Sequence, residues 1–285
     1  MSSPVQWRMA GVAALILGMT GAAQAATTVY SNNVGGDSFT NTSGSNQGQA
    51  VGSSGWYYNN VRADGVAGIS TAYPRNGNGS VGLSGPANAK ADIEFLSGAV
   101  NVLGNFYATT SLGNFADLAS MSYDWYRSSV STASAHFHPS LRVLVDIDGD
   151  VSNGGQAYLI FERAYNPNVT PVPTDQWVSD SVGSSTILWG SGSLQVGGNP
   201  LFQSLSTWQS QLSNAAILGF SAGVGSGWDG TFNGAVDNIG WNIGGNVSSY
   251  NFEVSPVPEP SGYLMALFSL GVIAAFARRR SSPRA

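Results

Sequence analysis

Residues 120–127 read SMSYDWYR and show the pattern that decides the fold. Met121, Tyr123 and Trp125 fall on one side of an extended chain, and the residues between them are serine and aspartate. Successive side chains of a β-strand point to opposite faces, so this period of two predicts a strand with one buried face. Trp125 is therefore expected in the core.

The segment 141–147, LRVLVDI, repeats the pattern. Val143, Val145 and Ile147 share one face, whereas Arg142 lies on the other. We predict further strands, bounded by turn-forming residues, at 28–31, 91–96, 157–162, 186–189, 216–224 and 235–243.

Two other stretches complete the outline of the body. Leu205, Trp208 and Leu212 recur at helical spacing and predict one short helix at 204–214. The Gly/Ser/Asn-rich stretch between the first strand and residue 55 is expected to form loops. Several short strands with spaced turns favour an all-β fold, an antiparallel β-sandwich of jelly-roll type, over residues 26–252.

Composition narrows the range of partners. The chain contains no cysteine, which excludes disulfides, thiolate metal sites and cysteine nucleophiles. Between residues 26 and 257, six basic residues oppose fifteen acidic ones, a balance of −9. Nucleic acids and anionic membranes require a protein surface that neutralises phosphate charge. The acidic body therefore argues against nucleic acid as a partner.

The first 25 residues have the three parts of a secretory signal peptide. Arg8 supplies the positive charge, residues 11–19 are apolar, and residues 23–25, AQA, have the small-residue pattern of a cleavage site. Export is predicted, with the mature protein beginning at Ala26.

The last thirty residues carry a second targeting signal. A linker at 253–260 leads into an apolar segment at 261–277, and a basic tail follows at 278–285. The apolar segment is short beside the ~20 residues of a standard transmembrane helix, and the arginines after it favour a cytoplasmic location for that end. The deciding residues are Val257, Pro258, Glu259, Pro260, Arg278, Arg279 and Arg280.

This order of motif, apolar segment and arginines resembles the PEP-CTERM sorting signal of exopolysaccharide-producing Gram-negative bacteria. The resemblance implies that the C-terminal helix anchors the chain in the inner membrane until an exosortase-type protease cuts near the motif. The body would then reach the cell surface or the extracellular space. An ordinary single-span anchor would give the same topology without the cut.

Residues 227–239, GWDGTFNGAVDNI, resemble the closing segment of concanavalin-like or carbohydrate-module-like sandwiches. Asp237 has the parity of Ile239 and Trp241, and we expect it to point towards the buried side of its strand. A buried carboxylate needs partners, which backbone N–H groups or a bound cation would supply.

Asp146, Asp148 and Asp150 form a D-x-D-x-D run at the end of a predicted strand. Alternating carboxylates in a tight loop suit calcium. The run departs from an EF-hand loop, because Val151 stands at the glycine position and Ala157 at the position of the bidentate glutamate. Calcium is one hypothesis for this run, and a solvated turn is the other.

Residues 90–95, KADIEF, resemble part of the E-x-D-x-E strand of laminarinase-like retaining glycosidases. Asp92 and Glu94 match the last two positions, but Lys90 stands where the nucleophile belongs. Retaining hydrolysis needs two carboxyl groups ~5 Å apart. An amphipathic edge strand is therefore favoured over a catalytic one.

His136 and His138 fall on one face of an extended segment and could supply half of a metal site. No glutamate follows at the spacing of a cupin-like site, which favours surface or hydrogen-bonding roles.

The body holds seven tryptophans, which can pack in a core or stack on sugars. Trp125 and Trp241 lie on apolar strand faces and are expected in the core. Trp177 and Trp228, together with Asp229, are the candidates for an exposed sugar-binding surface.

These observations favour a non-enzymatic exported β-sandwich associated with extracellular polysaccharide. The alternative is a polysaccharide-active, glycoside-hydrolase-like enzyme of concanavalin-like fold that uses Asp92 and Glu94. A third possibility is a structural surface protein with no ligand.

Overall fold

The computed structural model describes residues 25–166 and 172–256. Almost all of the predicted signal peptide, and the predicted C-terminal helix and basic tail, lie outside the described residues. Within the described residues, no helix is long and apolar enough to cross a membrane.

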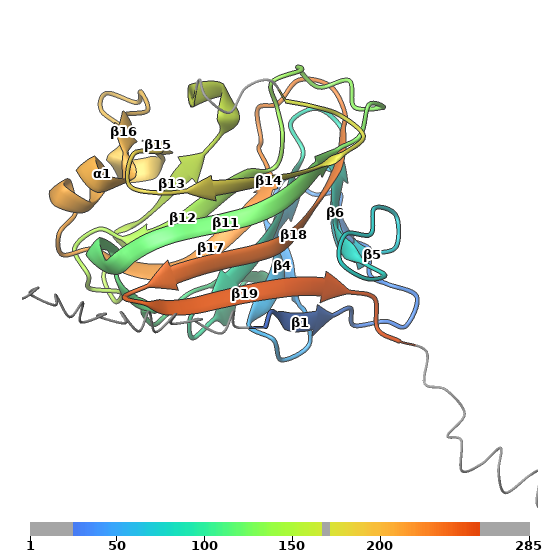
Figure 1. Ribbon diagram of the computed structural model, residues 1–285, viewed down its shortest axis with the longest axis horizontal. Helices are drawn as coiled ribbons and strands as arrows, with labels where there is room; N and C mark the ends of the chain where they lie inside the picture. Colours follow the sequence, from blue (N-terminus) through green and yellow to red (C-terminus); the bar gives the residue numbers. More distant parts are fainter. Residues whose placement is uncertain (1–24, 167–171, 257–285) are drawn as a thin grey trace, which may run out of the picture.

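The described strands form two large, mainly antiparallel sheets and one small hairpin (Figure 1). Sheet A has eight described strands: β1 (Thr27–Tyr30), β2 (Phe39–Asn41), β5 (Gly65–Ser70), β6 (Ser80–Gly85), β11 (Leu118–Arg127), β14 (Trp177–Val182), β18 (Phe232–Ile243) and β19 (Asn246–Glu253). Sheet B has nine described strands: β3 (Gln47–Ala50), β4 (Trp56–Arg62), β7 (Lys90–Leu96), β10 (Gly113–Asn114), β12 (Ser140–Asp146), β13 (Gln156–Phe161), β15 (Ile187–Gly190), β16 (Phe202–Ser204) and β17 (Ala216–Val224). The hairpin consists of β8 (Val100–Val102) and β9 (Asn105–Tyr107).

The described helical segments are short. The α-helix α1 (Leu205–Gln211) begins at the N-cap Ser204, whose side chain accepts a hydrogen bond from the Thr207 N–H, and it buries Leu205 and Trp208. This confirms the predicted helix. Three 3-10 turns are η1 (Phe115–Asp117), η2 (Arg163–Tyr165) and η4 (Gly192–Leu194).

Sheets A and B pack face to face, and their inward side chains form one core. Trp125 and Val143 have no exposed surface, as the alternation at 120–127 and 141–147 predicts. Aromatic rings join the two sheets: the ring of Trp241 in β18 stacks on that of Phe220 in β17, with their centroids 4.2 Å apart. The structure therefore confirms the antiparallel β-sandwich.

The predicted strands each correspond to a strand of the structure, but the prediction of loops before residue 55 is wrong. Strands β2 and β3 lie in that polar stretch, at the edges of sheets A and B. An edge strand is held mainly by hydrogen bonds to one neighbour and needs little apolar sequence. The sequence therefore carries no alternation that would reveal these two strands.

The segment 235–243 is also not the last strand. Strand β19 follows it and pairs with both β18 and the first strand, β1, the latter in parallel. Beyond β19, the Val254 N–H donates to Asn78 Oδ1 at 3.0 Å, and the Ser255 N–H donates to Ser31 Oγ at 2.9 Å. The folded body thus continues past the predicted boundary at residue 252.

Candidate functional site

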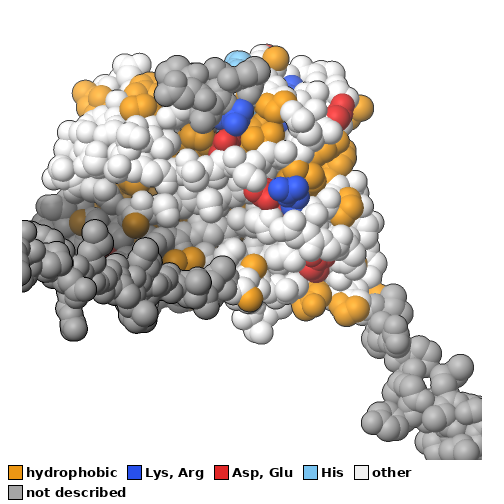
Figure 2. Space-filling model, viewed as in Figure 1, with side chains coloured by type: hydrophobic (Ala, Val, Ile, Leu, Met, Phe, Trp, Pro, Cys, Tyr) orange, Lys and Arg blue, Asp and Glu red, His pale blue; other side chains and the backbone are white. Residues whose placement is uncertain are grey.

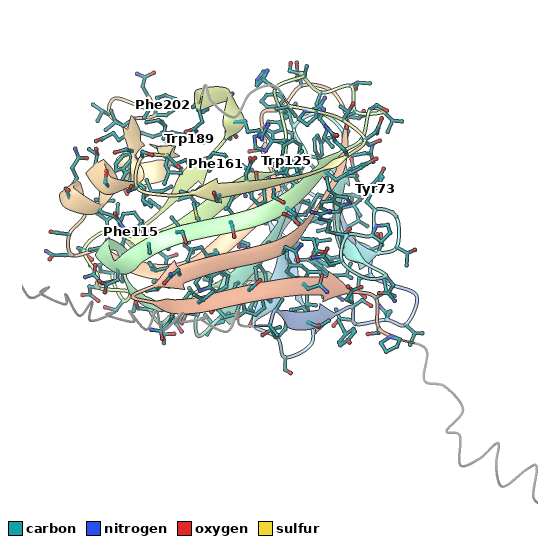
Figure 3. All side chains as sticks on the ribbon, in the orientation of Figure 1. Tyr73, Phe115, Trp125, Phe161, Trp189 and Phe202 are labelled. Atoms are coloured by element: carbon teal, nitrogen blue, oxygen red, sulfur yellow. The ribbon has the colours of Figure 1, made fainter. Side chains whose placement is uncertain are left out.

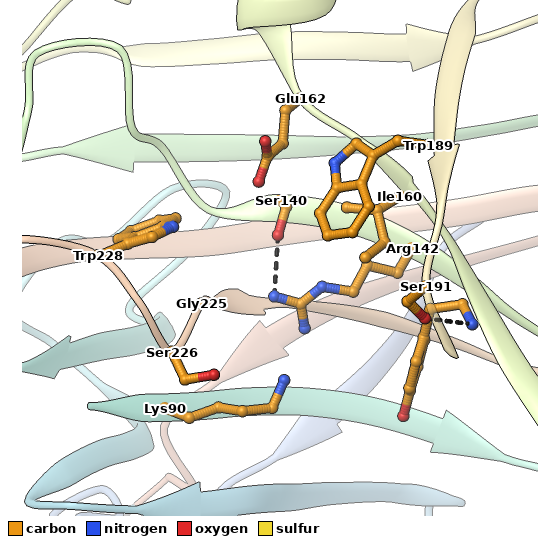
Figure 4. A pocket seen from close by; sticks show the side chains of 11 residues that line it. Lys90, Ser140, Arg142, Ile160, Glu162, Trp189, Ser191, Gly225, Ser226 and Trp228 are labelled. Carbon is orange, nitrogen blue, oxygen red and sulfur yellow. Dashed lines mark hydrogen bonds between the residues drawn. The ribbon is translucent and has the colours of Figure 1, made fainter. Parts of the chain in front are cut away.

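A pocket of about 230 Å³ opens on the outer face of sheet B, the face that points away from sheet A (Figure 4). Strands β7, β12, β13 and β15 and the loop after β17 supply its lining. The lining residues are Lys90, Ser140, Arg142, Tyr158, Ile160, Glu162, Trp189, Ser191, Gly225, Ser226 and Trp228. We call this site the sheet B pocket.

Strand parity explains how charged side chains reach this face. In β7, Ala91 and Ile93 have no exposed surface and face the core, so Lys90 and the acidic residues between them point outwards. In β12, Val143 faces the core, so Arg142 also points outwards. Strand β17 lies between β12 and β7 and brings these side chains within reach of one another.

An ion cluster forms the floor of the pocket. Asp92 accepts from Arg142 Nη1 on Oδ1 at 2.6 Å, and from Lys90 Nζ on Oδ2 at 2.9 Å. Asn60 Nδ2 donates to the same Oδ2 at 3.1 Å. Arg142 Nη2 also donates to Ser140 Oγ at 2.9 Å. Buried charges need such partners, because an unpaired charge inside a protein is strongly destabilising.

Glycine at position 223 makes room for this cluster. Gly223 in β17 is the register partner of Asp92 in β7. A Cβ at residue 223 would lie 2.0 Å from Asp92 Oδ1, far inside van der Waals contact. A side chain at position 223 would therefore displace the carboxylate that pairs with Arg142.

Glu94 lies beside this ion cluster and is shielded from the pocket. Its carboxyl accepts from Asn59 Nδ2 at 2.7 Å and from the Tyr158 hydroxyl at 2.9 Å. Burial and the nearby Asp92 charge raise the pKa of Glu94. For Asp92, burial acts to raise the pKa, but the charges of Arg142 and Lys90 outweigh it and the pKa is lowered. The pKa values of the two β7 carboxyl groups are therefore shifted in opposite directions.

These contacts correct the expectation for residues 90–95. Strand β7 is not an edge strand, because it lies between β17 and β4 inside sheet B. Asp92 and Glu94 are 0% and 1% exposed, and other side chains satisfy their oxygens. Of the eleven described residues that line the pocket, Glu162 is the one carboxylate. The pair of carboxyls that glycoside hydrolysis requires is therefore not presented by this lining.

Aromatic rings form the walls of the pocket. Trp189 and Tyr158 are half-buried, and the Trp189 indole nitrogen faces the Glu162 carboxyl (Figure 4). Burial raises the pKa of Glu162, and the Arg142 charge acts against this rise. The opposite wall is Trp228, whose ring stacks on that of Phe137 with their centroids 4.6 Å apart.

The aromatic surface continues beyond the pocket. Phe202 in β16 is the register partner of Trp189 in β15, so the two side chains lie on the same face of sheet B (Figure 3). Phe202 is 45% exposed, and its ring packs on that of Tyr165, which is 43% exposed. A row of partly exposed rings thus leads away from the ion cluster.

The structure separates the residues predicted to bind sugar. Trp228 lines the sheet B pocket but is only 8% exposed, less than we expected. Asp229 points elsewhere and accepts hydrogen bonds from the N–H and the hydroxyl of Ser134. Trp177 lies in β14 of sheet A, on the opposite side of the sandwich.

The aspartate run after β12 forms a hydrogen-bonded turn. Asp146 Oδ1 accepts from the Gly149 N–H, Asp148 Oδ1 from the Asp150 N–H, and Asp150 Oδ1 from the Ser152 N–H. In the described part of the chain, no group of three or more His, Cys, Asp or Glu side chains is placed to hold a metal ion. These hydrogen bonds hold the run as a turn, and calcium binding there stays a hypothesis to be tested.

The two histidines do not form a pair. They lie in the loop between β11 and β12 rather than in a strand. His138 is 1% exposed, and its Nε2 accepts from the Arg163 N–H at 2.9 Å. Burial lowers the pKa of His138 to about 4. His136 is exposed, with its ring against Phe137. Their roles are structural, as the sequence favours.

Sequence reasoning did not identify Lys90, Arg142, Tyr158 or Trp189 as site residues. The available signal was a charged residue at an outward position of otherwise apolar strands, as at Arg142. What the sequence lacks is the strand order that places β7, β17, β12 and β13 side by side.

Comparisons with known proteins identify one segment of the chain. Residues 256–281 match the PEP-CTERM protein-sorting motif. This confirms the predicted sorting signal, nearly all of which lies outside the described residues. The comparison with curated proteins found no match.

Two solved structures are similar to the body. One is the Family 11 carbohydrate-binding module of the cellulosomal cellulase Lic26A-Cel5E of Clostridium thermocellum, 9% identical over 80% of this chain and 93% of that chain, with a TM-score of 0.34. The other is a Family 11 module from the same organism in complex with a beta-1,3-1,4-mixed-linked tetrasaccharide, 10% identical over 74% of this chain and 98% of that chain, with a TM-score of 0.32.

Proposed function

We propose that this chain is an exported, non-enzymatic protein that binds extracellular polysaccharide through the sheet B pocket. The sorting motif at 256–281 supports export and membrane anchoring before an exosortase-type cut. The pocket supports binding, and the protein would act at the cell surface or in the matrix around the cell.

The observation that carries the binding proposal is the pairing of aromatic walls with a polar floor. Trp189 and Tyr158 present partly exposed rings, on which the apolar face of a sugar can stack. Arg142, Ser140 and Glu162 supply donors and acceptors for hydroxyl groups between these rings. A concave site with aromatic walls and a few fixed polar groups is the usual form of a small-molecule site.

The contacts of the Asp92 and Glu94 carboxyl groups favour sugar binding over sugar cleavage. Asp92 is held by two cations, and Glu94 lies under the Tyr158 hydroxyl. A retaining or inverting hydrolase needs a second reactive carboxyl across the sugar from the first. Glu162 has no such counterpart in the lining.

Isothermal titration of the exported protein with cellohexaose, laminarihexaose and a galacturonate hexamer tests the proposal. Trp189→Ala should weaken binding at the sheet B pocket at least tenfold, equivalent to ~1.4 kcal/mol or more, and can bring it below detection, because it removes a stacking ring. The matched control is Tyr107→Ala, which removes a ring that is 43% exposed in the β8–β9 hairpin, outside the pocket lining. Equal affinities for the Trp189 variant and the wild type, or no binding of any oligosaccharide, would contradict the proposal.

A further inference from the structure

A second hollow lies on the outer face of sheet A, on the opposite side of the sandwich from the sheet B pocket. It has a volume of about 260 Å³, and strands β5, β6 and β18 form its floor. We call it the sheet A groove. Gly68 and Gly82 are cross-strand partners in this floor. The Asp37 backbone covers Gly68, whereas Gly82 has open space above it, so a ligand can approach the sheet closely at Gly82.

Polar side chains without protein partners line this groove. Ser38, Ser84 and Asn233 border it, and none of their side chains makes a hydrogen bond to another described residue. Each is partly or fully exposed. Hydroxyl and amide groups of this kind can donate and accept at the same site, which suits the hydroxyl groups of a sugar.

An aromatic platform closes one end of the groove. Tyr73 lines the groove and stacks on Tyr126, with their ring centroids 4.5 Å apart. Trp177 lies next to Tyr126 at 5.8 Å, and the Arg75 guanidinium sits over the Trp177 ring at 5.7 Å. Arg75 is also paired with Asp124 at 2.8 Å, so its charge is compensated. Figure 2 shows that this face carries few charged side chains.

We propose that the sheet A groove is a second polysaccharide-binding site, for an uncharged glycan chain, and that the protein thereby bridges two chains. This inference rests on the proposed function, because it assigns the same class of ligand to a second face. The groove offers hydroxyl-bonding groups, an open floor at Gly82 and stacking rings. Its described lining contains no cation to attract an acidic glycan, and its one carboxylate, Asp37, is buried and hydrogen-bonded within the protein. Two sites on opposite faces cannot bind adjacent units of one short oligosaccharide. They join separate chains, so one protein molecule can cross-link two polysaccharide strands.

Gly82 offers a way to block the groove without disturbing the fold. A Cβ at this position would meet only Gly68 O and Ser70 Oγ, both at 3.5 Å, which is ordinary contact. Gly68 is unsuitable, because a Cβ there would lie 2.1 Å from the Asp37 carbonyl oxygen. Gly82→Val therefore places a branched side chain in the groove, and a strand position tolerates valine well. Tyr73→Ala provides a second variant that removes the stacking ring.

Titration of the exported protein with cellohexaose and laminarihexaose should give two sites per chain. Gly82→Val, Tyr73→Ala and Trp189→Ala should each reduce this to one site, and Gly82→Val combined with Trp189→Ala should abolish binding. Wild-type protein should also raise the viscosity of a soluble neutral β-glucan, and each single-site variant should lose that effect. Tyr107→Ala and an unchanged melting curve are the controls.

The outcomes separate the two proposals. One site in the wild type, lost in Trp189→Ala and kept in Gly82→Val, overturns the second site and leaves the proposed function standing. One site lost in Gly82→Val and kept in Trp189→Ala overturns the sheet B pocket and the bridging role. No binding of either neutral hexasaccharide overturns the second site, and no binding of the galacturonate hexamer in addition overturns both proposals.

Discussion

Asp237 is a carboxyl group with no exposed surface in β18. Its Oδ1 accepts from the N–H groups of Asn238 and Phe252, whereas Oδ2 has no partner within the described residues. Of the two kinds of partner expected for the Asp237 carboxylate, backbone N–H groups and a bound cation, the structure provides backbone N–H groups. Burial raises the pKa of Asp237 to about 7.

We expect Asp237→Asn to change how stability depends on pH. Because the pKa of Asp237 is raised, its contribution is complete below about pH 4 and is lost as pH rises through about 7. The unfolding free energy of Asp237→Asn, relative to that of the wild type, should therefore increase between these pH values by up to ~4 kcal/mol. Urea unfolding from pH 4 to 8 measures this difference.

The ionisation of His138 changes stability with pH in the opposite direction to that of Asp237. Burial lowers its pKa to about 4, so stability is lost as pH falls from 6.5 towards 4. His138 and Asp237 therefore oppose each other over this range in the wild type. A difference between Asp237→Asn and the wild type that stays constant with pH would show that Asp237 ionises normally in the folded protein.

The aspartate run forms the turn between β12 and β13, and the hydrogen bonds of this turn bear on whether the run binds calcium. Its carboxylates accept hydrogen bonds from the turn itself, including Asn153 Nδ2 to Asp148 Oδ2 at 2.8 Å. We therefore expect calcium to leave the melting temperature unchanged. Asp148→Asn should destabilise the protein slightly, because an amide nitrogen would then face the Asn153 amide.

Calorimetry with calcium and with chelator measures this outcome. A cation bound only by the folded state would add ~2.7 kcal/mol at a hundredfold excess over Kd. For a domain of this size, that gain would raise the melting temperature by roughly 5–10 °C. A rise of that size, abolished in Asp148→Asn, would establish the calcium site that the sequence pattern raised as one hypothesis.

For the whole molecule, β1 and β19 bring the beginning and the end of the body together as parallel neighbours (Figure 1). Ser31 and Asn78 then hold residues 254 and 255 against the body. The body is therefore continuous almost up to the PEP motif. We expect processing to remove both ends and leave this unit intact.

Mass spectrometry of the extracellular protein tests this expectation. The recovered chain should begin near Ala26 and end near Pro258. A surface species that keeps Arg278 to Arg280 would contradict processing and would leave export itself untouched.

The fold class and the sorting signal could both be predicted from the amino-acid sequence. Alternation at 120–127 and 141–147 depends only on neighbouring residues, because the pleat of a strand fixes which side chains share a face. The sorting signal is likewise one contiguous segment, and the match at 256–281 confirms it. The burial of Trp125 and Trp241 followed from the same local parity.

Which outward-facing residues contact one another could not be predicted from the sequence and depends on strand order in the folded protein. Arg142 and Asp92 are fifty positions apart, and β17 lies between their strands in sheet B. Strand order and register depend on how the two sheets close over one core, which no local pattern encodes. The same closure placed Trp177 and Trp228 on opposite sides of the sandwich and buried Asp92 and Glu94 beneath the pocket. The candidate sites therefore became visible only when strands distant in the sequence were paired.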